Sequence, residues 1–231
     1  MNQISFQNVY QTSTTPIAKL GQRAVTPDGR EWVYARAQAA VAKGLVAIPN
    51  GVTAVDTVSS STDAQSRIVY ITKASAGWTV DEFADGWVVV DDGTGVGQTG
   101  KIKTNTTDTL ELYPETAFTT ALSVVDSDIT IRTPWYVDPA AITVKIQSAV
   151  GIAQVAFAAA DYGWLLTDGV GTVIAGEALT VGGSFVTGDD TVGQVLKGTT
   201  AKGEFDEQTL GLCLVSNAAA DQQTLVMVHI R

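Results

Sequence analysis

The stretch from Gly86 to Asn105 reads GWVVVDDGTGVGQTGKIKTN. Its interpretation decides whether the chain is predicted to have an α/β fold or a β fold. Within it, Gly95-Val-Gly97-Gln-Thr-Gly100 fits the dinucleotide pattern G-x-G-x-x-G, and the same residues with Lys101 fit the first seven positions of G-x-x-x-x-G-K-[ST]. Both motifs work only where a strand leads into the loop and a helix follows it, as in α/β folds. In a β protein the same glycines would form the loop of a hairpin.

The residues that follow the glycines favour the hairpin. The sequence Ile-Lys-Thr-Asn-Thr-Thr-Asp-Thr comes directly after Lys101, and Thr and Asn are poor helix formers. Ile102 occupies the position where a phosphate loop needs a hydroxyl for Mg²⁺. A related stretch, Gly163 to Gly169, also runs from an aromatic-led strand into Asp-Gly, without a lysine. We therefore predict a strand-to-turn transition in both places and no nucleotide site.

The rest of the chain alternates short strand-like runs with turn residues, which predicts a mainly β fold. Leu20 to Ala37 has the pattern of a hairpin around Pro27-Asp28-Gly29-Arg30, and Ala37 to Gly44 is the best of few helix candidates. Further strands are predicted at Val52–Val58, Arg67–Thr72, Trp87–Val90, Thr109–Tyr113, Ser127–Arg132, Ile142–Gln147, Ile152–Phe157, Trp164–Thr167, Thr172–Ala175, Ala178–Val181, Phe185–Thr187, Gly193–Leu196, Leu210–Val215 and Leu225–Ile230.

These patterns predict an antiparallel β-barrel or sandwich domain with a β-rich insertion and an extended N-terminal arm. Residues 1–19 are polar with scattered apolar positions and predict the arm. Residues 20–49 and 138–231 are expected to form the barrel-like domain, and residues 50–137 the inserted β subdomain. The boundaries rest on Pro49-Asn50-Gly51 and on Pro134 and Pro139.

Composition argues against several classes of function. The formal net charge of −10 disfavours nucleic-acid binding, which needs a basic patch. The chain contains no run of 18 apolar residues, so no membrane span is predicted. The N-terminal residues lack the pattern of a secretory signal. The single histidine, His229, and the single cysteine, Cys213, both lie in apolar strand-like runs. We expect a strand histidine and a buried thiol, and no enzyme, cofactor or catalytic residue.

Two other groups of residues have alternative interpretations. The acidic pairs Asp91-Asp92, Asp126/Asp128 and Asp189-Asp190 border Gly, Ser or Thr, as turn residues do, although paired carboxylates also suit calcium or glycoside hydrolysis. Trp87 and Trp164 begin predicted strands and are expected to anchor the core, with a sugar-binding platform as the alternative.

Four segments resemble parts of structural proteins from tailed-phage virions. LGQRAVTPDGREWVYARAQAAVAKG (Leu20–Gly44) is similar to their N-terminal part, and FADGWVVVDDGTGVGQTGKIKTN (Phe83–Asn105) to a mid-chain part. YGWLLTDGVGTVIAGEALTVGGSFVTG (Tyr162–Gly188) resembles their C-terminal part. LGLCLVSNAAADQQTLVMVHI (Leu210–Ile230) resembles a closing strand pair that small capsid cement proteins also have. The order of these segments carries the resemblance.

The resemblance implies a capsid decoration, or cement, protein that binds the outer capsid surface and stabilises the shell. The implied partner is the major capsid protein, and such proteins commonly form small oligomers, with a trimer favoured here. The expected location is the capsid exterior of the virion, after synthesis in the host cytoplasm. A tail-tube or head–tail component and a carbohydrate-binding module stay open as alternatives. For contacts with a sister subunit or the capsid, the candidates in the arm are Ile4, Phe6, Val9 and Tyr10.

Overall fold

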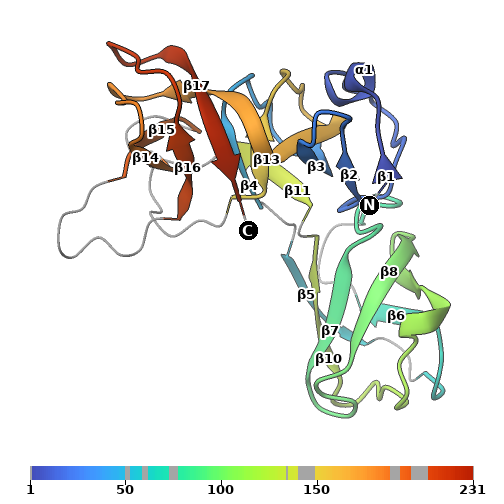
Figure 1. Ribbon diagram of the computed structural model, residues 1–231. Helices are drawn as coiled ribbons and strands as arrows, with labels where there is room; N and C mark the ends of the chain where they lie inside the picture. Colours follow the sequence, from blue (N-terminus) through green and yellow to red (C-terminus); the bar gives the residue numbers. More distant parts are fainter. Residues whose placement is uncertain are drawn as a thin grey trace. The chain divides into compact units, whose positions relative to one another are not determined.

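The computed structural model describes residues 2–49, 53–58, 62–72, 78–133, 135–139, 149–187, 193–198 and 208–230 (Figure 1). Nearly all regular structure in these residues is β, which confirms the predicted fold class. The described helices, α1 (Phe6–Val9) and the 3₁₀ helix η1 (Pro114–Thr116), have four and three residues and are too short to cross a membrane. The predicted strand at 142–147 lies outside the described residues.

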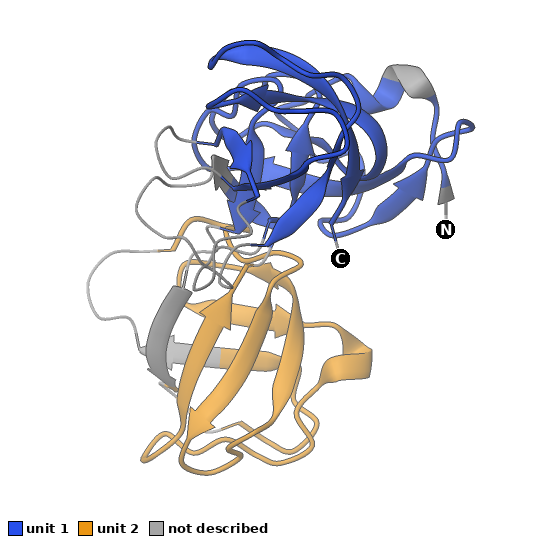
Figure 2. Ribbon diagram, turned by 60° about the vertical axis from the view of Figure 1, so that its left-hand side comes forward, with its two compact units in different colours: residues 1–50, 135–231 blue, residues 51–134 orange. Residues whose placement is uncertain are grey.

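The chain forms two compact units (Figure 2). Unit 1 comprises Met1–Asn50 and Trp135–Arg231, and unit 2 comprises Gly51–Pro134. The strands of unit 1 are β1 (Asn2–Gln3), β2 (Arg23–Val25), β3 (Glu31–Ala37), β4 (Val46–Pro49), β11 (Tyr136–Pro139), β12 (Gly151–Ala153), β13 (Tyr162–Ala175), β14 (Ser184–Thr187), β15 (Val195–Lys197), β16 (Thr209–Cys213) and β17 (Gln222–His229).

The pairings in unit 1 close two small rings of strands that share β13. In the first ring, β3, β11, β4, β12 and β13 pair in that order, and β13 pairs back with β3. Apolar side chains from all five strands fill it, among them Val33, Ala47, Val137, Ala153 and Leu165. In the second ring, β13, β15, β14, β16 and β17 pair in order, and β17 returns to β13.

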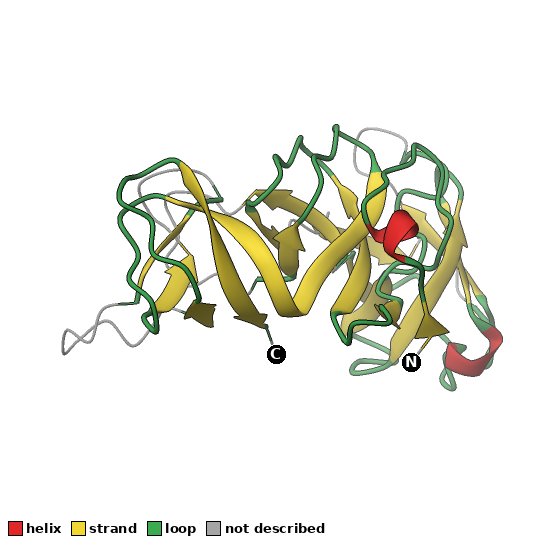
Figure 3. Cartoon of the chain, turned by 45° about the horizontal axis from the view of Figure 1, so that its top comes forward, coloured by secondary structure: helices red, strands yellow, loops and turns green. Residues whose placement is uncertain are grey.

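The shared strand β13 corrects one prediction. The sequence suggested two strands separated by a turn at Asp168-Gly169, but residues 162–175 form one strand of 14 residues, which Figure 3 shows as a long curved ribbon. The Asp-Gly pair makes a bend inside the strand, because Gly169 has a φ of +104° and pairing continues beyond it with β17. The bend redirects the strand from the first ring to the second.

Two further differences concern helices. The candidate helix at 37–44 is absent, because its N–H groups bind carbonyls elsewhere in the chain and not those of the preceding turn. Gln38 N–H donates to Val137, and Val41 N–H donates to Phe157. The α1 turn, which the polar arm did not predict, begins after Ser5, whose Oγ accepts from the N–H of Asn8 at 3.4 Å. The arm is thus partly helical.

Unit 2 is a closed barrel in the order β10-β5-β6-β9-β8-β7. Its strands are β5 (Thr53–Val58), β6 (Ile68–Thr72), β7 (Trp87–Asp92), β8 (Thr99–Asn105), β9 (Thr109–Leu112) and β10 (Asp128–Arg132). Its core contains Phe83, Val88, Val90, Ile102 and Ile131, all fully buried. Its first and last strands are antiparallel neighbours, with Thr53 opposite Arg132. The two ends of unit 2 therefore lie side by side.

The prediction that Trp87 anchors the core of unit 2 is wrong. Trp87 is 43% exposed, because the alternation of β7 turns Val88 and Val90 inward and Trp87 outward. Trp164 in unit 1 is buried, as expected.

Candidate functional site

The N-terminal arm lies over an aromatic outer face of the first ring. Alternation along β3 turns Val33 and Ala35 into the core and leaves Tyr34 on the outside, where its ring lies 5.0 Å from that of Trp164. The arm covers this face: Ser13 pairs with Tyr162 in both directions, and the N–H of Ile17 donates to Tyr34 Oη at 3.0 Å. Burial accordingly raises the pKa of Tyr34.

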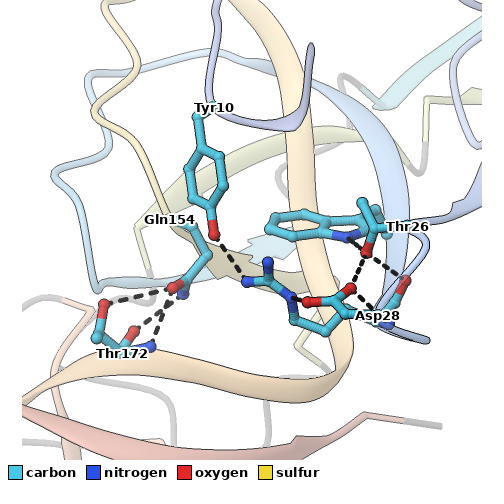
Figure 4. Close-up of polar contacts among 7 residues, drawn as sticks. Tyr10, Thr26, Asp28, Gln154 and Thr172 are labelled. Carbon is cyan, nitrogen blue, oxygen red and sulfur yellow. Dashed lines mark hydrogen bonds and ion pairs between the residues drawn. The ribbon is translucent and has the colours of Figure 1, made fainter. Parts of the chain in front are cut away.

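A single arginine fastens the arm to the β2–β3 turn (Figure 4). Arg30 donates from Nε to Asp28 at 2.6 Å and from Nη1 to the hydroxyl of Tyr10 at 2.7 Å. Its guanidinium also lies 5.4 Å from the ring of Trp32. The turn is closed by Thr26, which donates to Asp28 at 2.6 Å and accepts from Trp32 Nε1. Burial alone would raise the pKa of Asp28, but the bonds from Thr26 and Arg30 outweigh it and lower the pKa.

The four arm residues predicted to make contacts have different surroundings. Val9 is fully buried within its own chain, and Tyr10, although 40% exposed, binds Arg30. Ile4 is half-buried, and its N–H donates to Val25. The side chain of Phe6 lies outside the described residues. Their contact with the capsid or with a sister subunit stays a prediction, and Ile4 and Tyr10 retain surface for it.

A glutamine side chain joins the two rings of unit 1 (Figure 4). The carboxamide of Gln154, which follows β12, accepts from the N–H of Thr172 at 3.0 Å and donates to its C=O at 3.0 Å. The carboxamide thus makes the two backbone hydrogen bonds that a neighbouring strand would otherwise make to Thr172, just past the bend in β13. Gln154 is only 5% exposed, so these bonds are shielded from water.

The glycine-rich loop in unit 2 is a hairpin between β7 and β8, as predicted. Gly93, Gly95 and Gly97 all have positive φ, and a Cβ on Gly93 would overlap the carbonyl oxygen of Asp126. The loop is bound to the segment before β10: Thr94 donates to Asp126 at 2.9 Å, and Gln98 accepts from the N–H of Thr120 at 2.8 Å.

Four N–H groups of this hairpin already have partners within the chain. Those of Val96, Gly97 and Gln98 donate to backbone carbonyls, and that of Gly93 donates to Asp92. A phosphate loop needs such groups free and convergent. Lys101 lies within β8, where its ammonium is 5.5 Å from the ring of Tyr113. The geometry gives the nucleotide motif no phosphate cradle.

The acidic pairs that the structure describes serve turns and strands. Asp91 accepts from the hydroxyl of Thr130 at 2.6 Å, and Asp126 accepts from Thr94, which lowers the pKa of Asp126. Among the described residues, no group of three or more His, Cys, Asp or Glu side chains is placed to hold a metal ion. Asp189 and Asp190 lie outside the described residues.

The second ring of unit 1 carries an open groove that sequence analysis missed. Its volume is about 480 Å³, and residues of β13, β16 and β17 line it, including Leu212, Met227 and His229. His229 Nδ1 lies 2.5 Å from a carboxylate oxygen of Asp168 at one end. The alternation of Leu225-Val-Met-Val-His-Ile could have signalled it, since one side of that strand must face outward. Cys213 is buried, as expected.

Comparisons with known proteins give one structural likeness. No family model matches the chain, and no curated protein matches its sequence significantly. Among solved structures, it is similar to the N base of the head fiber gp8.5 of bacteriophage phi29, with a TM-score of 0.34 and 12% sequence identity. The match covers 85% of this chain and 92% of that chain.

Proposed function

We propose that the chain is a structural protein of a tailed-phage virion, and specifically a capsid decoration protein that binds the outer surface of the shell. The main support is the position in the fold of the four sequence segments that resemble virion proteins. Leu20–Gly44 contains the β2–β3 hairpin, Tyr162–Gly188 contains β13 and β14, and Leu210–Ile230 contains β16 and β17. Phe83–Asn105 contains the β7–β8 hairpin of unit 2. The resemblance therefore falls on strands of both rings of unit 1 and of the barrel of unit 2.

The action proposed for such a protein is mechanical. Closed barrels remove free strand edges, so contacts with a partner come from the outer faces and the arm. Each contact can be weak, because many copies on one particle multiply its effect. The acidic balance of 24 Asp and Glu against 14 Lys and Arg suits a protein that lies outside the shell, away from packaged DNA. The proposed partner is the major capsid protein, and no catalytic step is involved.

The decisive experiment is copy number and position in purified particles. Quantitative mass spectrometry against the major capsid protein should find hundreds of copies, and an asymmetric reconstruction should place them on the capsid exterior. A handful of copies, or density confined to the tail or the head–tail junction, would contradict decoration and favour another virion role. Saturable binding on a glycan array, without binding to particles, would support the carbohydrate-binding alternative.

The arm can be tested with a substitution milder than truncation. Deleting residues 1–15 would uncover part of the aromatic face as well as remove the arm, because Ser13 pairs with Tyr162 and the ring of Tyr10 lies against that of Trp32. Ile4→Lys changes a half-buried side chain and should weaken binding to undecorated capsids by roughly tenfold if Ile4 lies in the contact. Val125→Lys, at a position 88% exposed in unit 2, is the matched control. Equal affinity for both variants would remove Ile4 from the contact.

A further inference from the structure

The outer face of the second ring of unit 1 is apolar where three strands run side by side. Five of its side chains point to solvent with exposed fractions between 38% and 49%: Val170, Leu212, Leu214, Leu225 and Met227. We call this set the outer apolar face. The largest contiguous apolar patch on a soluble protein is often functional, so this face is a candidate interaction site.

The strand register explains why these side chains lie together. Met227 on β17 is directly opposite Val170 on β13 and Leu212 on β16, so the three form a row across the sheet. Leu225 lies two residues before Met227 on the same side of β17, and its C=O accepts from the N–H of Leu214. Met227 is therefore the centre of the face, with the groove of about 480 Å³ beside it.

The face carries almost no charge. Strands β13, β16 and β17 contain no Glu, Lys or Arg, and their only Asp and His, Asp168 and His229, bind each other beside the groove. The whole chain has a net charge of −10, so two copies repel wherever their acidic surfaces meet. At this face the three strands contribute one carboxylate, which is bound to His229, so little repulsion is expected there.

The size of the face also suits a pair of identical chains. Five partly exposed Val, Leu and Met side chains present roughly 300–400 Å² of apolar surface, the size of the largest patch on a typical monomer. A standard interface buries about 800 Å² on each partner, a little more than half of it apolar. The outer apolar face thus supplies most of the apolar share that one partner needs.

We propose that a second copy of this chain docks on the outer apolar face, with the two faces related by a two-fold axis near Met227. Each face meets the same face of the other copy, as in an isologous dimer. The sheets stack as in a β-sandwich, about 10 Å apart, and side chains from each copy enter the groove of the other. This pair differs from the trimer that the sequence resemblance favours, and it stands independently of the proposed virion role.

The test uses the purified chain and sedimentation equilibrium. The wild-type protein should have a mass near twice 24.2 kDa at micromolar concentration. Met227→Lys and Met227→Glu should each raise the dimer dissociation constant by roughly 100-fold or more, since like charges then face each other at the axis. An equimolar mixture of the two variants, one labelled with ¹⁵N, should regain dimers that native mass spectrometry identifies as mixed pairs. Added salt should tighten the wild-type dimer by screening its acidic surfaces.

Several results would overturn the proposal. They are a monomer at hundreds of micromolar, a trimer, or an oligomer whose dissociation constant neither substitution at Met227 changes. Failure of the mixed variants to pair would exclude a two-fold axis near this residue. Val125→Lys, the same kind of change at an exposed position in unit 2, should leave the wild-type mass unchanged. Because Met227 is exposed in the single chain, both variants should keep the wild-type unfolding temperature when compared as monomers.

Discussion

Replacing Gln154 with alanine tests the connection between the two rings of unit 1. The carboxamide is the partner of both the N–H and the C=O of Thr172, and alanine leaves both groups without it. Removing one partner of a shielded hydrogen bond costs about 1–3 kcal/mol. Thr172 is half-buried, so water can form part of the hydrogen bonding that the carboxamide of Gln154 provided. We expect a decrease in the free energy of unfolding of about 2–4 kcal/mol for the two groups together.

Differential scanning calorimetry gives the measurement. For a unit of this size, about 2–4 kcal/mol corresponds to a fall in the unfolding temperature of roughly 5–15 °C. Unit 2 contains none of the changed contacts, so its transition serves as an internal reference. Gln223→Ala, at an exposed position on β17, is the matched control and should change the free energy of unfolding by less than about 0.5 kcal/mol.

A second substitution at the same position checks the hydrogen-bond argument by pH. In Gln154→Glu the carboxylate would be buried against the C=O of Thr172, so folding should raise its pKa above the ordinary value of about 4.3. A raised pKa means that the protonated form stabilises the fold and that this stability is lost as pH rises. The deficit relative to wild type at the same pH should therefore shrink toward pH 4. A deficit of under 0.5 kcal/mol for Gln154→Ala, or one for Gln154→Glu that does not depend on pH, would refute the reasoning.

Four further outcomes follow from individual contacts. Tyr10→Phe removes the acceptor of Arg30 and should speed amide exchange in residues 4–12 by several-fold, whereas unchanged exchange would mean that the bond does not hold the arm. Gly93→Ala should destabilise unit 2 by about 2–4 kcal/mol through its positive φ and the overlap with Asp126, and leave the calorimetric transition of unit 1 in place. The pKa of Asp126 is lowered in the folded protein, so its bond with Thr94 stabilises the fold at pH values above the pKa of Asp126 in the unfolded chain. This stability is lost as the pH falls through the lower pKa of the folded state. Asp126→Asn should therefore make the free energy of unfolding of unit 2 depend less on pH in acid. Burial, and then the bond to Asp85, raise the pKa of Tyr113 to about 12, so in ultraviolet titration Asp85→Asn should shift one tyrosine toward the ordinary value of 10.0.

Local pattern was enough to predict most strands and the hairpin nature of the glycine loop. Alternation and turn residues decide such features within a few residues of chain, as the β7–β8 hairpin shows. The bend in β13 was mistaken for a turn because Asp-Gly permits either outcome. The choice depends on β17, which pairs with Asp168 through Ala175 from a distant part of the sequence. Likewise, the segment 37–44 is not helical because partners near residues 137, 153 and 157 take its N–H groups.

The surfaces were harder to predict than the strands. An arm with Val9 and Tyr10 was recognisable from its mixed composition, but its attachment to Arg30 and the aromatic face depends on pairing that composition does not encode. The outer apolar face could be predicted only in part, because alternation indicates that one side of each strand faces outward but not which side. Leu212 and Met227 look like core residues in any single strand, and only the closure of the ring decides which side of each strand faces solvent. Trp87 was assigned to the wrong side for the same reason.

The adjacent ends of unit 2 have a consequence for how the chain folds. Unit 1 must bring residues before 50 together with residues after 135, and an unstructured connection of about 80 residues makes that search costly in entropy. Once unit 2 has folded, Thr53 and Arg132 are neighbours, and the effective connection shrinks to a few residues. Each halving of loop length saves about 0.6 kcal/mol, so roughly four halvings recover about 2.4 kcal/mol for assembly of unit 1. The folded unit 2 would then hold the two parts of unit 1 close together while unit 1 folds. A short linker in place of unit 2 should shorten the connection in the same way.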